Sequence, residues 1–165
     1  MKKFIIFILI FFNVSISQSQ EMAIIDLQFI INNSNKGKDI QNELKKIEQN
    51  NIKFFKENEN LLNIEREKLI KQSNVISKEI YEKEKVNFNK KLDEYKLLKE
   101  NKLKEWDKLK KEKFSELLID INKIIIDYID DNKISTILDK KYVIITKSNS
   151  DITKIILNNL NEQIK

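Results

Sequence analysis

The side chains of this sequence that could take part in chemistry are carboxylates, lysines, hydroxyls and amides, because its 165 residues include no His and no Cys. Without these two residues there is no imidazole general base, no thiolate nucleophile and no nitrogen- or sulfur-ligated metal site. The single glycine, Gly37, excludes glycine-rich loops that bind phosphates or dinucleotides. Carboxylates on exposed helix faces lack the enclosed site that shifts pKa values. We therefore expect no enzyme, no cofactor and no metal site.

The charged residues make up 35% of the chain and alternate in sign along it. Lys and Arg number 31 against 26 Asp and Glu, and the basic residues form no block typical of a nucleic-acid-binding face. This pattern is typical of solvated helix surfaces crossed by ion pairs, so nucleic acid is not an expected partner. The sequence pI of 9.1 leaves weak contact with a membrane surface open.

Residues 1–19 have the pattern of a cleavable signal peptide. Two lysines precede nine consecutive apolar residues, Phe4 to Phe12, and small residues follow. Nine apolar residues are fewer than the ~20 that span a bilayer as a helix, so we favour cleavage over a membrane anchor. The expected cleavage site lies after Ser17 or Ser19, and the sequence predicts an exported protein.

Residues 36–131 predict a long helical hairpin. The apolar residues form a thin seam at 3- and 4-residue steps, typical of a coiled coil, and Asn and Lys interrupt it. One helix of this length would extend ~144 Å, so we expect the chain to fold back once. The least charged stretch, 72–77, is the predicted tip, where Ser77 can cap the returning helix. The expected neighbours across the hairpin are Leu62 and Phe88, Phe55 and Tyr95, Ile47 and Leu103, and Leu44 and Trp106.

The two ends of the chain, 20–35 and 132–165, predict a small β-rich body and so an α+β, mostly α fold class. We expect a strand of about six residues within Met22–Ile31, with helix as the weaker option, then strands at Ile134–Leu138 and Tyr142–Thr146. A final helix would follow, capped by Ser150 or Asp151. One chain can hardly cover the apolar stripe that ends the hairpin, which favours an oligomer. The residues expected in the oligomer body are Ile25, Leu27, Leu117, Ile121, Ile124, Tyr128, Val143 and Ile145.

Three stretches resemble the Skp (OmpH-like) family of periplasmic chaperones, namely 22–41, 72–84 and 134–153. They are similar to the family's opening strand with its helix start, its hairpin tip, and its closing strands with the last helix. The resemblance implies a periplasmic homotrimer in which long hairpins extend from a β-rich body around a cavity. It also implies ATP-independent binding of unfolded outer-membrane β-barrel proteins before they insert.

Val75, Ile76 and Tyr81, in or beside the predicted tip, are the candidate residues for contact with such an unfolded protein. The same residues could instead serve turn and seam packing. A second function stays open from another class, a structural coiled-coil spacer or adaptor of a periplasmic envelope assembly. A spacer would not suppress the aggregation of unfolded protein, so that property separates the two.

Overall fold

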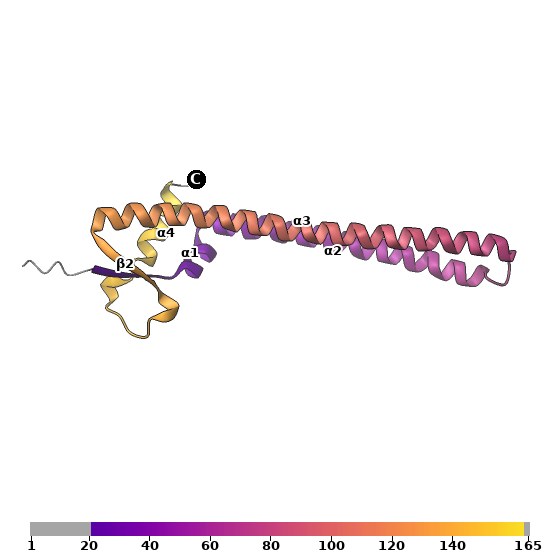
Figure 1. Cartoon of the computed structure of the whole chain (residues 1–165), viewed down its shortest axis with the longest axis horizontal. Coiled ribbons are helices and arrows are strands. Elements are labelled where there is room, and N and C mark those ends of the chain that lie inside the picture. Colours follow the sequence, from indigo (N-terminus) through magenta and orange to yellow (C-terminus); the bar gives the residue numbers. More distant parts are fainter. Residues whose placement is uncertain (1–20, 164–165) are drawn as a thin grey trace, which may run out of the picture.

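A long two-helix hairpin extends from a small body in this computed structural model, which describes residues 21–163 (Figure 1). The predicted signal peptide, 1–19, lies outside the described residues. The element bounds are β1 Glu21–Ile25, α1 Leu27–Asn33, α2 Asn35–Gln72, α3 Lys78–Asn132, β2 Ile134–Asp139 and α4 Thr153–Gln163, with 3₁₀ turns at Lys140–Tyr142 and Ser148–Ser150. The predicted mostly helical α+β fold class is confirmed.

Local side-chain chemistry sets the ends of the hairpin helices. The Ser34 hydroxyl accepts a hydrogen bond from the backbone N–H of Gly37 at the start of α2 (3.1 Å). Ser77 caps α3, as its position predicts, by accepting from the N–H of Ile80. Lys133 ends α3 in the left-handed conformation, with φ of 56°. Between these caps the chain has neither Pro nor an interior Gly beyond Gly37, so long helices are favoured.

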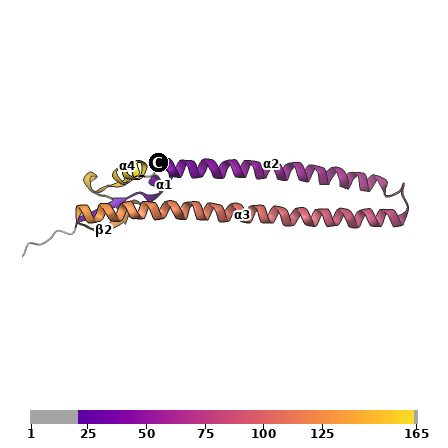
Figure 2. The same ribbon diagram turned by 90° about the horizontal axis from the view of Figure 1, so that it is seen from above.

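The two long helices lie side by side along the hairpin (Figure 2). The indole N–H of Trp106 donates to the carbonyl of Leu44 (3.3 Å), and the Tyr95 hydroxyl lies 3.4 Å from the carbonyl of Phe55. The predicted pairs Leu44–Trp106 and Phe55–Tyr95 are therefore confirmed. Nearer the tip, Phe88 lines a groove with Leu69, two turns further along α2 than the predicted neighbour Leu62.

The sheet consists of β1 and β2 in parallel, and it departs from the predicted strand at 22–31. Strand β1 ends at Ile25, because the Asp26 carboxylate caps α1 by accepting from the N–H of Phe29 (2.8 Å). Leu27 consequently lies at the start of α1, half-buried against the core, rather than in a strand.

The predicted strand at Tyr142–Thr146 is wrong for the described chain. Lys140–Tyr142 forms a 3₁₀ turn, Val143 is half-buried, and Ile144 and Ile145 are 97% and 89% exposed. A β-prone run becomes a strand only where a neighbouring strand accepts and donates its backbone hydrogen bonds. Within residues 21–163, no strand pairs with this segment.

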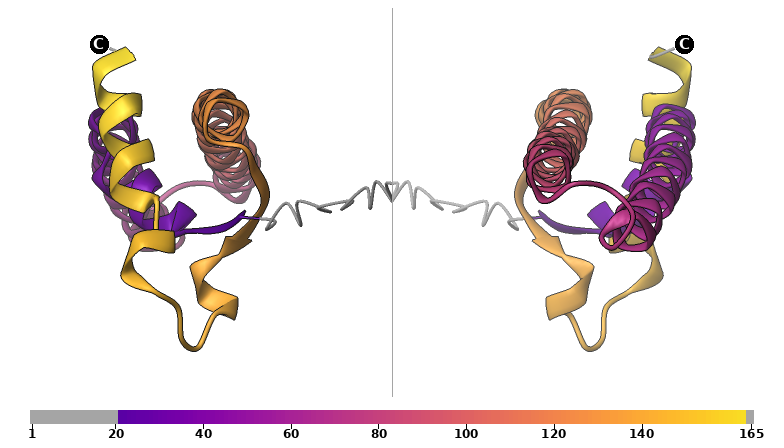
Figure 3. Two further views of the ribbon diagram at one scale, coloured as in Figure 1. Left: turned by 90° about the vertical axis from the view of Figure 1, so that its left-hand side faces the viewer. Right: turned by 90° about the vertical axis from the view of Figure 1, so that its right-hand side faces the viewer.

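The core of the body joins the two ends of the chain. Leu117 and Ile121 on α3 are 0% exposed, and Ile124 is also buried. They belong to one apolar cluster with Ile25 and with Ile152, Ile156 and Leu160 at the C-terminal end; Tyr128 packs on it. Figure 3 shows α4 across from α3, beside α2. The inner stripe of α3 is thus covered within one chain, which corrects the expectation that a second chain must cover it.

Candidate functional site

The tip of the hairpin presents an apolar side chain to solvent. The backbone N–H groups of Val75 and Ile76 both donate to the carbonyl of Gln72, at 2.9 and 3.1 Å, and this closes the turn after α2. Val75 is 80% exposed, whereas Ile76 and Tyr81 are half-buried. Of the three predicted contact residues, Val75 is the one that the turn leaves freely accessible.

Two exposed residues beside the tip were missed by the sequence reasoning. Ile70 on α2 and Ile80 on α3 are both more than half exposed, one on each side of the turn. The sequence indicated their exposure, because neither residue falls on the 3- and 4-residue spacing of the seam. Residues 68–78 also contain three lysines and no acid, so the tip is locally apolar and positive.

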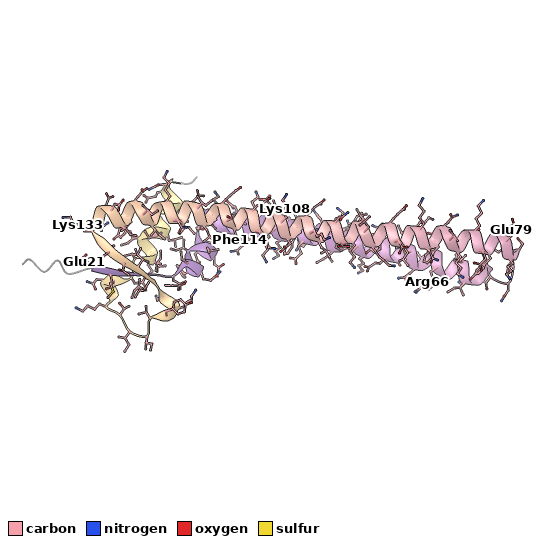
Figure 4. All side chains as sticks on the ribbon, viewed as in Figure 1. Glu21, Arg66, Glu79, Lys108, Phe114 and Lys133 are labelled. Atoms are coloured by element: carbon pink, nitrogen blue, oxygen red, sulfur yellow. The ribbon has the colours of Figure 1, made fainter. Side chains whose placement is uncertain are left out.

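The arms carry further apolar side chains outside the seam. They are spread along both helices, separated by charged residues, and so form separate small contacts rather than one patch. In Figure 4 side chains project outward all along the hairpin, from Phe114 near the body to Arg66 and Glu79 near the tip. The exposed members between the body and the tip are Ile52, Leu61, Ile64, Val86, Leu97, Leu98 and Leu103. Leu103 is the predicted seam neighbour of Ile47, and its exposure corrects that prediction.

Lysines lie over the aromatic rings of the seam. The Nζ atom of Lys102 is 4.9 Å from the ring centre of Phe54, and that of Lys110 is 5.2 Å from the ring centre of Trp106. Both distances are within the range of cation–π attraction. The two ammonium groups therefore contribute a weak attraction across these aromatic side chains.

A three-residue polar contact joins the helices at mid-arm. The Glu59 carboxylate accepts from the Tyr95 hydroxyl (2.8 Å) and from Lys99 Nζ (2.7 Å). The hydrogen bond from Lys99 lowers the pKa of Glu59 most, and the hydrogen bond from Tyr95 lowers it further. Burial of the phenol raises the pKa of Tyr95, and the hydrogen bond to the Glu59 carboxylate adds to this shift. Both shifts favour the forms present at neutral pH, a charged carboxylate and a neutral phenol. The contact is therefore a structural link rather than an acid–base pair.

The body carries a second apolar surface, on the side of α3 away from the core. Leu118, Ile119 and Ile126 are exposed, and Ile129 is half-buried. Here α3 is apolar on its inner and outer faces, whereas a helix beside solvent normally has a polar outer face. The predicted body residue Ile145 lies in the exposed segment 142–145, which projects from the body below β2 in Figure 3.

A hollow of about 360 Å³ in the body contains the ion pair between Lys140 and Asp151 (2.7 Å). The hydrogen bond to Asp151 raises the pKa of Lys140. Each group thus has its partner within the chain. Among residues 21–163, no group of three or more Asp and Glu residues is placed to hold a metal ion. No helix in this part of the chain is long and apolar enough to cross a membrane.

The sequence and the fold both resemble known proteins. The sequence profile of the family described as outer membrane protein (OmpH-like) matches residues 21–160. The fold is similar to the crystal structure of a candidate outer membrane chaperone (OmpH-like) from Caulobacter crescentus CB15, with a TM-score of 0.81 and 21% sequence identity. That superposition covers 88% of this chain and 86% of the other. No curated protein matches the sequence.

Proposed function

The chain belongs to the OmpH-like outer membrane protein family, and from this premise we propose that it is an ATP-independent periplasmic holdase. It binds unfolded outer-membrane β-barrel proteins and prevents their aggregation before membrane insertion. Unfolded barrel strands expose alternating apolar residues, and these associate readily when unpaired. A protein that holds them needs an accessible surface of many weak contacts.

The observation that carries this proposal is the distribution of exposed aliphatic side chains along the hairpin. Seven large aliphatic residues of the arms are exposed outside the seam, and Val75 is exposed at the tip. Each contributes a small contact that forms and breaks quickly, and several together give avidity. Lysines beside them attract acidic segments with a strength that falls as salt rises.

We also propose that the protein is a homotrimer held together by its bodies. Support comes from the outer face of α3 and from the segment 142–145, where Tyr142, Ile144 and Ile145 are almost fully accessible in one chain. Three exposed bulky apolar residues within four positions are costly in a monomer and are typical of a surface covered by a partner. A trimer would place three hairpins around a shared space.

Export by the signal peptide at 1–19 completes the proposal, with cleavage after Ser17 or Ser19. N-terminal sequencing of the protein recovered from the periplasm tests this part. A sequence that still begins at Met1 would contradict it.

The experiment that tests the function is an aggregation assay with an unfolded outer-membrane barrel diluted out of urea. The full protein should suppress light scattering without ATP. A variant with residues 49–101 replaced by a short flexible linker should keep an oligomeric body by size-exclusion light scattering, yet lose the suppression. If the full protein gives no suppression, the spacer function is favoured. If the shortened variant protects equally well, the arms are not the binding surface.

A further inference from the structure

The seam of the hairpin becomes polar between the body and the tip. Beyond Leu44, the α2 seam position that recurs every seven residues is occupied by Asn51, Asn58, Glu65 and Gln72, all of them half-buried. Polar residues at such positions fix the register of a coiled coil and reduce its stability. Glu65 and Gln72 weaken the seam in the half nearer the tip, whereas Asn51 and Asn58 lie in the half nearer the body, which has additional links.

The half of the hairpin nearer the body has several independent links. The Trp106 indole donates to the Leu44 carbonyl. Lys113 forms an ion pair with Glu43 across the two helices (3.0 Å). Beyond them the helices enter the apolar core of the body.

The half nearer the tip has few links. Between Glu59 and the turn, the buried seam residues are Leu69 and Phe88. A groove of about 440 Å³ opens between the helices beside them. The ion pair there, Glu65 with Lys91, is about half exposed, and exposed pairs of this kind contribute little to stability.

Glu59, Tyr95 and Lys99 lie at the boundary between these halves, and we propose that they form a clasp. One carboxylate oxygen accepts both hydrogen bonds, and the Lys99 Nζ atom lies 5.2 Å from the ring centre of Phe55 and 5.9 Å from that of Tyr95. The shared acceptor and the two rings fix the position of a lysine that an isolated pair would leave free. The clasp lets the hairpin open from the tip as far as Glu59 and keeps it closed from there to the body.

The consequence for binding rests on the proposed function, whereas the clasp itself is a property of the free protein. The length of the arm beyond the clasp sets how far the two helices of each hairpin can separate around an unfolded protein. Failure of the clasp would leave the holdase proposal intact, because the apolar contacts of the arms do not depend on it.

Hydrogen–deuterium exchange of the full-length free protein tests the clasp. In the wild type, amides of 60–72 and 78–94 should exchange faster than those of 44–58 and 96–110, with the change located near Glu59. Glu59→Gln should raise exchange on the body side of residue 59 about tenfold, because both hydrogen bonds to the carboxylate are weakened together. Tyr95→Phe removes one of the two bonds and should raise exchange in the same region by a smaller factor. Exchange at the tip should stay unchanged.

The matched control is Glu57→Gln, which makes the same substitution two residues away. Glu57 pairs with Lys53 on its own helix at 3.9 Å, and within residues 21–163 it forms no hydrogen bond or ion pair across the hairpin. Uniform exchange along the wild-type hairpin would overturn the proposal. So would clasp variants whose exchange matches that of the control. Tyr95→Phe keeps the ring in the seam, so it tests the hydrogen bond without a packing defect.

Discussion

Replacing Gly37 with alanine should destabilise the protein, although the same change in an ordinary exposed helix interior stabilises by about 0.8–1.0 kcal/mol. Gly37 lies in the first turn of α2, where the chain bends sharply after α1. A Cβ atom added there would lie 1.8 Å from the carbonyl oxygen of Ile31 and 2.8 Å from the Ser34 hydroxyl oxygen. Because the first contact is with backbone, α1 would have to move as a unit.

The expected net loss is about 1–3 kcal/mol. Forcing an extra carbon into a packed site costs about 1–3 kcal/mol, and displacing the Ser34 cap costs about 1 kcal/mol. The gain in helix propensity offsets about 1 kcal/mol of this sum. The displacement would reach the core, because Ile30 on α1 is completely buried.

Urea unfolding followed by far-UV circular dichroism and by the fluorescence of Trp106, the single tryptophan, measures the loss. Each variant should be compared at one protein concentration, since an oligomer's stability depends on it. Ser34→Ala removes the cap without filling space and should lose about 1 kcal/mol. Lys38→Ala, at an exposed neighbouring position, should be close to neutral. A Gly37→Ala protein as stable as the wild type would refute the steric reasoning.

Other substitutions distinguish the inner and outer surfaces of α3 in the body and test one charged group. Ile121→Asp should unfold the body, because it leaves an unpaired charge in a fully buried position. Ile126→Asp on the outer face should keep the helical content and dissociate the proposed oligomer, and circular dichroism with light scattering distinguishes the two outcomes. Burial alone would raise the pKa of Asp151, but hydrogen bonds from Lys140 and Thr153 outweigh it and lower the pKa below its ordinary 3.8. The stability contributed by Asp151 is therefore present above that value and lost as pH falls through the folded pKa. The free energy of unfolding should drop progressively as pH falls below about 5, and it should drop less in Asp151→Asn.

The hairpin was predictable from sequence because its determinants are local. Charged and amide residues favour helix wherever Pro and Gly are absent, and Ser77 marks a helix start by its own hydroxyl. The cross-hairpin neighbours of Phe55 and Leu44 follow once the turn is placed. The error at Phe88 arose because the pairing was assumed to be symmetric about the turn at 73–77, which shifts the expected pairs by several residues. The ion pairs Lys36–Asp120 near the body and Glu65–Lys91 near the tip have the same register, and this register sets Phe88 beside Leu69 rather than Leu62.

The body was less predictable because its determinants are not local. Asp26 could have been read as a helix cap, which would have ended the first strand at Ile25. The segment 142–146 has strong β propensity but no neighbouring strand in the described chain, and sequence pattern alone does not provide a neighbour. The cover of Ile121 by α4 joins residues far apart in sequence, and an amphipathic final helix does not reveal which surface it will cover. At the tip, the spacing indicated apolar residues but not that Ile76 and Tyr81 would be half-buried.

The pairing of β1 with β2 has a consequence for the order of folding. Ala23 lies opposite Ile137 in a parallel sheet, so the body cannot form until nearly all of the described chain has been synthesised. Contacts within the hairpin form between segments joined by a short turn, and local contacts of this kind form early. A folded hairpin then brings the ends of α2 and α3 together and removes most of the loop-closure entropy that the parallel pair would otherwise cost. The long helices therefore serve as the folding template of the small body that holds them. A chain truncated before β2 would keep the hairpin helices but could not form the β1–β2 sheet of the body.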